Sequence, residues 1–372
     1  MIYILLLLAL MASAAIAPAS VRYAGEPSMP PGAKDLADQL MRFALICLIP
    51  AALVTLVVGL RDGVGTDFYR YVAHFEIIRD GADIFFREPG YTLLARVAAH
   101  FQDGQVVFFM LCAAVTNAFL FYAIYRNGYP CPALVIALLF ALGAILMQTN
   151  QVRHAMAMAV LFLGLSCIWK GQFVRYSLLV GLAASFHYTA LIFYPLYWLA
   201  RIRLPFFYMT VLCGLSLVLL FSYPVLMSAL EVAAPMLPPQ YAHYLQEMAH
   251  RGPALTSGLG ILLIFMGGYV ALFLLHHIGP PLSVRERVIA NLTLLGLLMH
   301  TALANVWALN RLSDYLIMFL GVLMALVVAR EDSPPARAVL FLGFLSWGVL
   351  LFFVALLGGS HGAIPYRNVL LP

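Results

Sequence analysis

Polar side chains that can do chemistry stand at three places between long apolar runs of this sequence. The residues are Gln151, Arg153 and His154, then His187 within Ala-Ser-Phe-His-Tyr-Thr-Ala, and then Arg311 and Asp314. Guanidinium groups pair with phosphate or carboxylate oxygens, and an imidazole can accept a proton near neutral pH. Burying such groups among apolar residues is costly, and function or pairing usually offsets the cost. These residues are candidates for an anion site and a base, whereas packed histidines and arginines that close helix ends are the ordinary alternative.

Residues 61–103 form the most polar stretch of the chain, and aromatic residues alternate with the charged ones there. Such a mixture suits a layer at the membrane interface. It also suits sugar binding, because ring faces stack on sugars and carboxylates accept hydrogen bonds from hydroxyl groups. An ordinary interfacial loop with solvated charges is the alternative. The candidate residues in this stretch are Arg61, Asp67, Tyr71, Glu88 and Tyr91.

The composition predicts what must position these residues. Of 372 residues, 64% are hydrophobic and 10% are charged, and mean hydropathy is +0.95. Soluble domains carry about 25% charged residues, so a water-soluble core is excluded. We expect an all-α, polytopic integral membrane protein with about 10–12 transmembrane helices in one transmembrane domain over residues 1–372.

The first seventeen residues resemble a signal peptide. However, their apolar run has no Lys or Arg before it, which favours an uncleaved first helix. Five scattered cysteines indicate neither a disulfide framework nor a metal site.

The distribution of charge predicts an orientation. Short interhelical segments are basic, and the positive-inside rule places them in the cytoplasm. All of them reach that side if residues 174–199 form a re-entrant helical hairpin whose tip lies near His187. The inside then holds twelve basic and six acidic residues, and the outside nine basic and ten acidic. Residues 61–103 become an extracytoplasmic interfacial segment and 231–255 a second outer loop. A continuous tilted helix over 174–199 is the alternative.

Several motifs, in order along the chain, resemble those of the EpsG family, the Wzy-like polymerases of bacterial exopolysaccharide and O-antigen. Residues 61–71 are similar to its "R…GTD…Y" signature, 88–94 to "EPGYxLL", 151–157 to "RQxxA" and 184–190 to "AxxFHxSA". Residues 310–315 and 364–366 resemble its late Arg-Tyr helix and C-terminal Pro-Tyr. One departure is His154, which stands where the family usually has Gln.

The resemblance implies a fold like that of lipid-donor (GT-C-like) glycosyltransferases in the bacterial inner membrane, with an active site facing the periplasm. It implies transfer of an oligosaccharide from undecaprenyl pyrophosphate to the terminal sugar of another lipid-linked repeat unit. The expected partners are this lipid-linked oligosaccharide, membrane lipids and a candidate chain-length regulator, with no nucleic acid. No cofactor and no metal are expected. A flippase for lipid-linked sugars and a membrane acyltransferase are the alternative functions.

That reaction suggests roles for the candidate residues. A leaving pyrophosphate needs positive charge, which Arg supplies, and an attacking hydroxyl needs a base. His187 is the first candidate for the base and Asp67 the second, while Arg153 and Arg311 are assigned to the pyrophosphate. The candidates for substrate binding are Arg61, Tyr71, Glu88, Tyr91, Gln151, His154 and Asp314.

Overall fold

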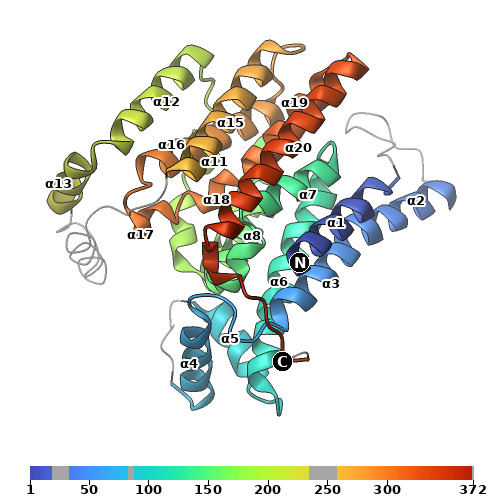
Figure 1. Cartoon of the computed structure of the whole chain (residues 1–372), viewed down its shortest axis with the longest axis vertical. Helices are drawn as coiled ribbons and strands as arrows, with labels where there is room; N and C mark the ends of the chain where they lie inside the picture. The colour runs from blue at the N-terminus through green and yellow to red at the C-terminus, as the bar shows by residue number, and fades with distance from the viewer. Residues whose placement is uncertain (19–32, 83–87, 234–257, 371–372) are drawn as a thin grey trace. The chain divides into compact units, whose positions relative to one another are not determined.

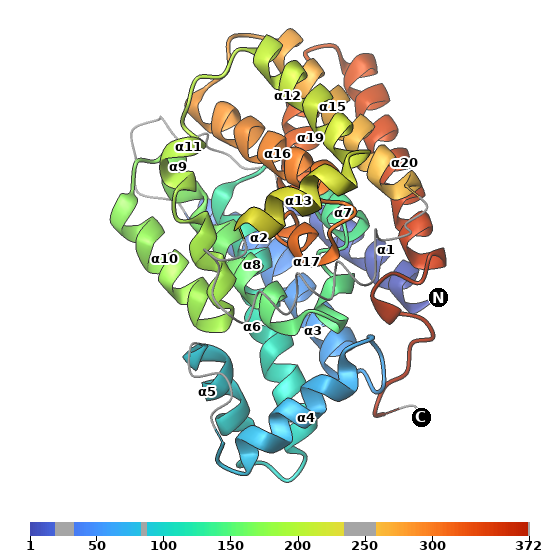
Figure 2. The same cartoon turned by 90° about the vertical axis from the view of Figure 1, so that its left-hand side faces the viewer.

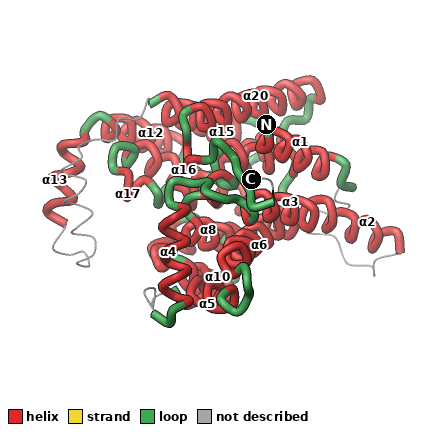
Figure 3. The backbone as a smooth tube through the Cα atoms, turned by 60° about the horizontal axis from the view of Figure 1, so that its bottom comes forward, coloured by secondary structure: helices red, strands yellow, loops and turns green. Residues whose placement is uncertain are grey.

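The computed structural model describes residues 1–18, 33–82, 88–233 and 258–370, and this part of the chain is helical with no strand (Figure 3). It divides into two compact units. Unit 1 comprises Met1–Trp198 and Gly348–Pro372, and unit 2 comprises Leu199–Trp347. We describe each unit by itself.

Unit 1 contains the helices that hold most of the candidate residues. They are α1 (Ile2–Ala15), α2 (Ala33–Phe43), α3 (Ile49–Gly59), α4 (Phe68–Arg79), α5 (Pro89–Ala98), α6 (Gly104–Asn127), α7 (Pro132–Ala141), α8 (Val152–Gly164), α9 (Ser166–Trp169), α10 (Phe173–Phe186) and α11 (Leu196–Leu199). A π-helical turn, Ala44–Leu48, joins α2 to α3. Short 3-10 turns lie at Leu146–Thr149, Tyr188–Phe193 and Ser360–Gly362.

The centre of unit 1 is a row of packed helices in which α6 contacts α3 and α8, and α8 contacts α10. Polar side chains join three of its elements. Asn117 of α6 donates to Thr55 of α3 and accepts a 3.1 Å hydrogen bond from Gln148 of the turn before α8. Such interhelical hydrogen bonds stabilise helix pairs where water is scarce. They fix the turn that leads into the polar residues at the start of α8.

Helices α4 and α5 lie together at one end of unit 1, beside the end of α6 (Figures 1 and 2). Phe75 of α4 stacks on Phe108 of α6 with ring centroids 5.4 Å apart. Gly104, the first residue of α6, allows the chain to approach closely, because a Cβ there would lie 2.8 Å from the Ala98 carbonyl oxygen. The segment predicted as an interfacial layer at 61–103 therefore contains two helices packed on α6.

Unit 2 is built on long apolar helices and several short ones. They are α12 (Phe206–Leu220), α13 (Tyr223–Ala233), α15 (Leu259–His277), α16 (Val284–Ala302), α17 (Trp307–Asn310), α18 (Asp314–Ile317) and α19 (Phe319–Arg330). Helix α20 (Pro334–Leu357) crosses the division between the units at residue 348.

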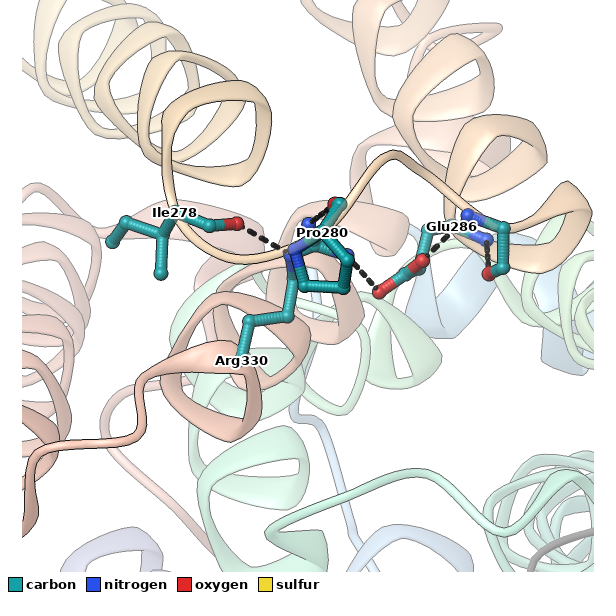
Figure 4. Close-up of polar contacts among 5 residues, drawn as sticks. Ile278, Pro280, Glu286 and Arg330 are labelled. Atoms are coloured by element: carbon teal, nitrogen blue, oxygen red, sulfur yellow. Dashed lines mark hydrogen bonds and ion pairs between the residues drawn. The ribbon is translucent and has the colours of Figure 1, made fainter.

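Arg330 joins three helix ends in unit 2 (Figure 4). Its guanidinium donates 2.9 Å to the Ile278 carbonyl, 2.6 Å to the Glu286 carboxylate and also to the Pro280 carbonyl. Glu286 in turn forms a capping box with Ser283 at the start of α16. The end of α19 is thereby held against the turn that connects α15 with α16.

Five helices are long and apolar enough to cross a membrane, by length and composition: Asp35–Gly59, Gly104–Asn127, Val152–Trp169, Leu259–His277 and Pro334–Leu357. The chain is therefore an all-α, polytopic membrane protein, as predicted. Three apolar helices of 10–17 residues accompany them among the described residues. The total of 10–12 transmembrane helices remains a prediction.

Three long apolar runs of the sequence, 206–230, 131–148 and 312–329, are not single continuous helices in the structure. The run 206–230 bends by 90° between α12 and α13. Pro224 at the start of α13 explains the break, because proline lacks the N–H and its ring excludes a continuous helix. The run 131–148 ends its helix at Ala141, just before Gly143 at φ 84°. The run 312–329 is divided between α18 and α19. The outer loop predicted at 231–255 lies outside the described residues from 234 onward.

The chain after His187 packs back on α10, while the re-entrant membrane hairpin itself remains a prediction. Helix α10 has 14 residues and is therefore about 21 Å long, too short for a hydrocarbon core of about 30 Å. The returning arm packs on it: the Tyr176 hydroxyl donates 2.6 Å to the Phe193 carbonyl, and Ser177 donates 3.2 Å to the Tyr194 hydroxyl. The side of the membrane on which the tip lies remains a prediction.

Candidate active site

Three chain segments of unit 1 meet at the carboxylate of Glu88. Arg153 at the start of α8 places Nη1 2.5 Å from Oε2 of Glu88. His187, where α10 ends, places Nδ1 2.7 Å from Oε1, and the Tyr188 N–H donates 3.3 Å to the same oxygen. The two carboxylate oxygens thus have different partners, and one buried anion holds a cation and an imidazole side by side.

The local sequence explains why Glu88 can serve as this centre. It precedes Pro89, which starts α5 and needs no N–H at the first helical position. Its side chain makes no capping bond to its own helix, so the carboxylate points to other segments. Burial acts to raise the pKa of the Glu88 carboxyl, but the His187 hydrogen bond and the Arg153 charge outweigh it. The net effect holds that pKa below its ordinary value, and Glu88 is ionised.

The ionised carboxylate determines the tautomer of His187. A carboxylate only accepts hydrogen bonds, so Nδ1 of His187 must carry the proton that it shares with Glu88. In the neutral form of an imidazole with that proton, Nε2 is the basic nitrogen. The His187 side chain remains 20% exposed, whereas that of Glu88 is 2% exposed. The imidazole is therefore accessible from outside the protein, and the carboxylate is not.

Arg153 is held from a second direction by an aromatic ring. Its guanidinium carbon lies 5.6 Å from the centroid of the Tyr91 ring, which is fully buried. His154, the next residue, is buried and its ring centroid lies 5.9 Å from that of His187. The structure therefore brings together four of the predicted site residues around Glu88: Tyr91, Arg153, His154 and His187.

Asn150 connects this cluster to the segment that carries Asp67. Its side-chain oxygen accepts 2.5 Å from the Thr66 hydroxyl and 2.8 Å from the Asp67 N–H. Gly65 makes this approach possible at φ 105°, because a Cβ there would lie 2.0 Å from the Thr149 carbonyl oxygen. Asp67, the second candidate base, lies at the start of α4, and its carboxylate faces Arg70 at 3.7 Å.

Arg61 stands at the start of the segment between α3 and α4 and is 2% exposed. It donates 2.6 Å to the Val58 carbonyl, and its guanidinium carbon lies 4.4 Å from the Phe109 ring centroid. Within the described part of the chain, its Nε and Nη2 have no hydrogen-bond partner. Burial lowers the pKa of Arg61 to about 10. The predicted sugar contact would need an exposed guanidinium. Here the Arg61 side chain is buried and supports the segment between α3 and α4.

Residues 362–367, near the C-terminus, support the segment between α3 and α4. The N–H of Gly65 donates 3.0 Å to the Gly362 carbonyl, and that of Asp62 donates 3.1 Å to the Arg367 carbonyl. The Tyr366 hydroxyl donates 2.9 Å to the Val57 carbonyl. The Pro-Tyr motif near the C-terminus thus helps to position the segment between α3 and α4.

Two residues of α4 complete the electrostatic surroundings of Arg153. Tyr71 is 6% exposed, and its ring contacts that of His74 edge-on at 5.8 Å. Burial and the charges of Arg153 and Arg70 lower the pKa of His74 to about 4, so this imidazole is neutral.

Gln151 is buried at the N-cap position of α8, and its side-chain oxygen accepts no hydrogen bond from the described residues.

Arg311 and Asp314 belong to unit 2 and are described within that unit. Arg311 follows α17 and is exposed, and Asp314 opens α18 and is partly buried. The intervening Ser313 donates 2.7 Å to the Asn310 carbonyl, which fixes the turn between them. Their predicted roles stay predictions. Within the described residues, no three His, Cys, Asp or Glu side chains are grouped as metal ligands would be.

Three features of this site were not predicted from the sequence. His74 was not a candidate, although an ionisable residue within the polar segment was a signal. Asn150 was not identified as the residue that holds Thr66 and Asp67. Glu88 was predicted to position a sugar, and its partnership with His187, 99 residues away, had no signal in local spacing.

Comparison with known proteins assigns the chain to a family. The EpsG family matches residues 44–368, which include every residue of the cluster and its braces. A comparison with curated proteins and one with solved structures gave no match. Because the family match covers most of the chain, this protein belongs to the EpsG family and is a polysaccharide polymerase-like membrane protein.

Proposed function

We propose that this protein polymerises oligosaccharide repeat units on the outer face of the bacterial inner membrane. It transfers a glycan from undecaprenyl pyrophosphate to the terminal sugar of another lipid-linked unit, so that the chain grows and the lipid pyrophosphate leaves. Membership of the EpsG family supports the class of reaction. The observation that carries the chemistry is the 2.7 Å contact between Glu88 and Nδ1 of His187.

This contact supports His187 as the general base for the acceptor sugar. Nε2 accepts the proton of the acceptor hydroxyl as its oxygen attacks the anomeric carbon of the donor. The bond between that carbon and the pyrophosphate oxygen breaks, and the electron pair leaves with the lipid pyrophosphate. Glu88 keeps the imidazole in the required tautomer and stabilises the imidazolium that forms, as carboxylates do in hydrolase triads. The proton then passes from His187 to the leaving group or to water.

Arg153 is proposed to meet the charge that develops on the leaving pyrophosphate. A guanidinium has five N–H donors in a planar fork that suits phosphate oxygens. The Arg153 side chain is 22% exposed, so it can face an anion while Glu88 and Tyr91 hold it in place. Arg311 is proposed for the same task, and Asp67 remains the alternative base. The buried Arg61 and Tyr91 then act by positioning their neighbours.

Deletion of the gene followed by glycolipid analysis tests this function. We expect polymer to vanish while single lipid-linked repeat units persist and reach the outer face. A flippase deletion would instead leave repeat units on the cytoplasmic face, and an acyltransferase deletion would leave long polymer without its acyl groups. Long polymer of normal composition in the deletion strain would contradict all three functions.

Complementation with variants then tests the site. His187→Ala and Glu88→Gln should fail to restore polymer at wild-type membrane abundance. Asp80→Asn removes a carboxylate that is exposed in the same polar segment and should restore it. Polymerisation by the purified protein should persist in a chelator, because arginine is proposed to supply the positive charge.

A further inference from the structure

A cavity of about 300 Å³ lies at the end of unit 1 where α4, α5 and α6 meet. Phe75 and Glu76 of α4, the turn residues Phe101, Gln102 and Asp103, and Gln105 of α6 line it. Its volume is at the lower end of the range for small-molecule sites, about 300–1,000 Å³. Among the described residues, no hydrogen bond, ion pair or ring contact joins this lining to Glu88 or His187, so the cavity is separate from the candidate active site.

The lining combines an exposed ring with uncommitted polar groups. The Phe101 side chain is 55% exposed, although it is large and apolar. Within the described part of the chain, no hydrogen bond or ion pair involves the side chains of Gln102, Asp103 and Gln105. Amides both donate and accept, and a carboxylate only accepts. The cavity therefore offers an apolar face together with donors and acceptors for several hydroxyl groups.

The cavity lies at a defined place relative to the active site. Helix α5 runs from Glu88, its N-cap residue, over 10 residues to Ala98, which corresponds to about 15 Å. Phe75 at the cavity stacks on Phe108, and Phe108 contacts Tyr91 edge-on at 5.5 Å. Tyr91 underlies Arg153. Packed rings thus connect the cavity wall with the guanidinium, which keeps the two places at a constant separation.

We propose that this cavity is a distal saccharide subsite, which binds sugar residues of the glycan away from its reacting end. The proposal rests on the proposed function. An exposed ring for the C–H face of a sugar, amide groups and a carboxylate for its hydroxyls, and a fixed separation of about 15 Å from Glu88 support it. A glycan bound at His187 would fill the subsite only if its sugars extend about 15 Å from the reacting end, which a longer glycan does. The subsite therefore favours longer chains as substrates.

Variants of Phe101 test the subsite without touching the reacting atoms. Phe101→Ala removes the ring and Phe101→Tyr retains it. Leu93→Ala is the matched control, because Leu93 is 60% exposed on α5 and does not line the cavity. The probes are the single-repeat and multi-repeat oligosaccharides that mild acid releases from the glycolipids of the deletion and wild-type strains. Binding to the purified full chain in detergent and the length of polymer in complemented cells are measured.

We expect Phe101→Ala to bind the multi-repeat oligosaccharide about tenfold more weakly and the single repeat as well as the wild type does. Cells complemented with Phe101→Ala should still join two repeat units but make shorter polymer. Phe101→Tyr and Leu93→Ala should behave as the wild type. Unchanged binding and polymer length in Phe101→Ala would overturn the subsite, and so would an equal loss for both probes. Polymer in the deletion strain would instead refute the proposed function, and the binding measurement would still decide the subsite.

Discussion

Oε1 of Glu88 lies 2.7 Å from Nδ1 of His187, although 99 residues separate them in the chain. The carboxylate starts α5 and the imidazole ends α10, so two helix termini face each other in the interior of unit 1. The second oxygen of the same carboxylate holds Arg153. A base and a cation are therefore positioned by one buried anion.

Glu88→Gln should abolish most polymerisation while the protein still folds. The amide has the shape of the carboxylate but no charge, so it neither requires the Nδ1–H tautomer of His187 nor stabilises the imidazolium. We expect the rate to fall at least about a hundredfold. The rate should be measured with purified protein and lipid-linked repeat units, and compared with Asp80→Asn. A rate near that of the wild type would remove Glu88 from the mechanism.

Arg153→Ala should cost about 3 kcal/mol of transition-state stabilisation, and Arg153→Lys should restore little of it. An ammonium cannot bridge Glu88 and a phosphate oxygen in the forked geometry of a guanidinium. Polymer should be compared at equal membrane abundance. Arg311→Ala should have a similar effect for the same charge reason, and normal polymer from either alanine variant would exclude that arginine from pyrophosphate binding.

Gly65→Ala should destabilise the protein and reduce polymer more than Gly81→Ala does. Both glycines have positive φ angles, 105° and 95°, so both substitutions strain the backbone. At Gly65 a Cβ would also lie 2.0 Å from the Thr149 carbonyl oxygen, whereas at Gly81 nothing lies within 4 Å. We expect about 1–3 kcal/mol of additional destabilisation at Gly65. Thermal unfolding in detergent checks this, and equal effects of the two substitutions would contradict the close approach.

The stability of the folded protein should decrease on mild acidification because of His74. Its pKa is lowered from 6.5 to about 4, first by burial and then by the charges of Arg153 and Arg70, while Asp67 and Glu88 act in the opposite direction. A folded-state pKa below the unfolded value means that this stability is fully present above pH 6.5. It is lost progressively as the pH falls toward 4, because the unfolded chain binds the proton first.

Unfolding temperatures between pH 7 and pH 5 measure this contribution, since carboxyl groups remain largely ionised over that range. His74→Gln should have a flatter profile than the wild type. His277→Gln replaces an imidazole that is exposed at the end of α15 and is the control. Parallel profiles for the wild type and His74→Gln would contradict the neutral, buried imidazole.

The membrane topology predicts that cysteines placed near Lys170 and near Arg203 in a Cys-free chain both lie inside. An impermeant thiol reagent added to intact spheroplasts should label neither, while it should label a cysteine at the exposed Asp80 position. The short arms on either side of His187 are the reason, because neither is long enough to cross the bilayer. Labelling near Arg203 without labelling near Lys170 would show a true span and exclude the re-entrant hairpin.

Residue types and their order were enough to predict the class of the protein and to name most of the residues that meet at Glu88. Composition and charge distribution carry this information, because helices in a membrane must be apolar and short basic segments favour one side. The order of the motifs from Arg61 to Tyr366 was sufficient to indicate the EpsG family, which the match over residues 44–368 shows.

The surroundings and partners of those residues depend on the folded chain. Local spacing cannot tell which carboxylate of a polar segment turns inward, since that depends on the packing of α5 against α6 and α10. This packing places Glu88 against both His187 and Arg153. It also buries Arg61 and Tyr91, which by their residue type alone suited contact with a sugar. Burial and pairing arise from contacts between distant segments, and for that reason they decide the chemistry of each side chain only after the chain has folded.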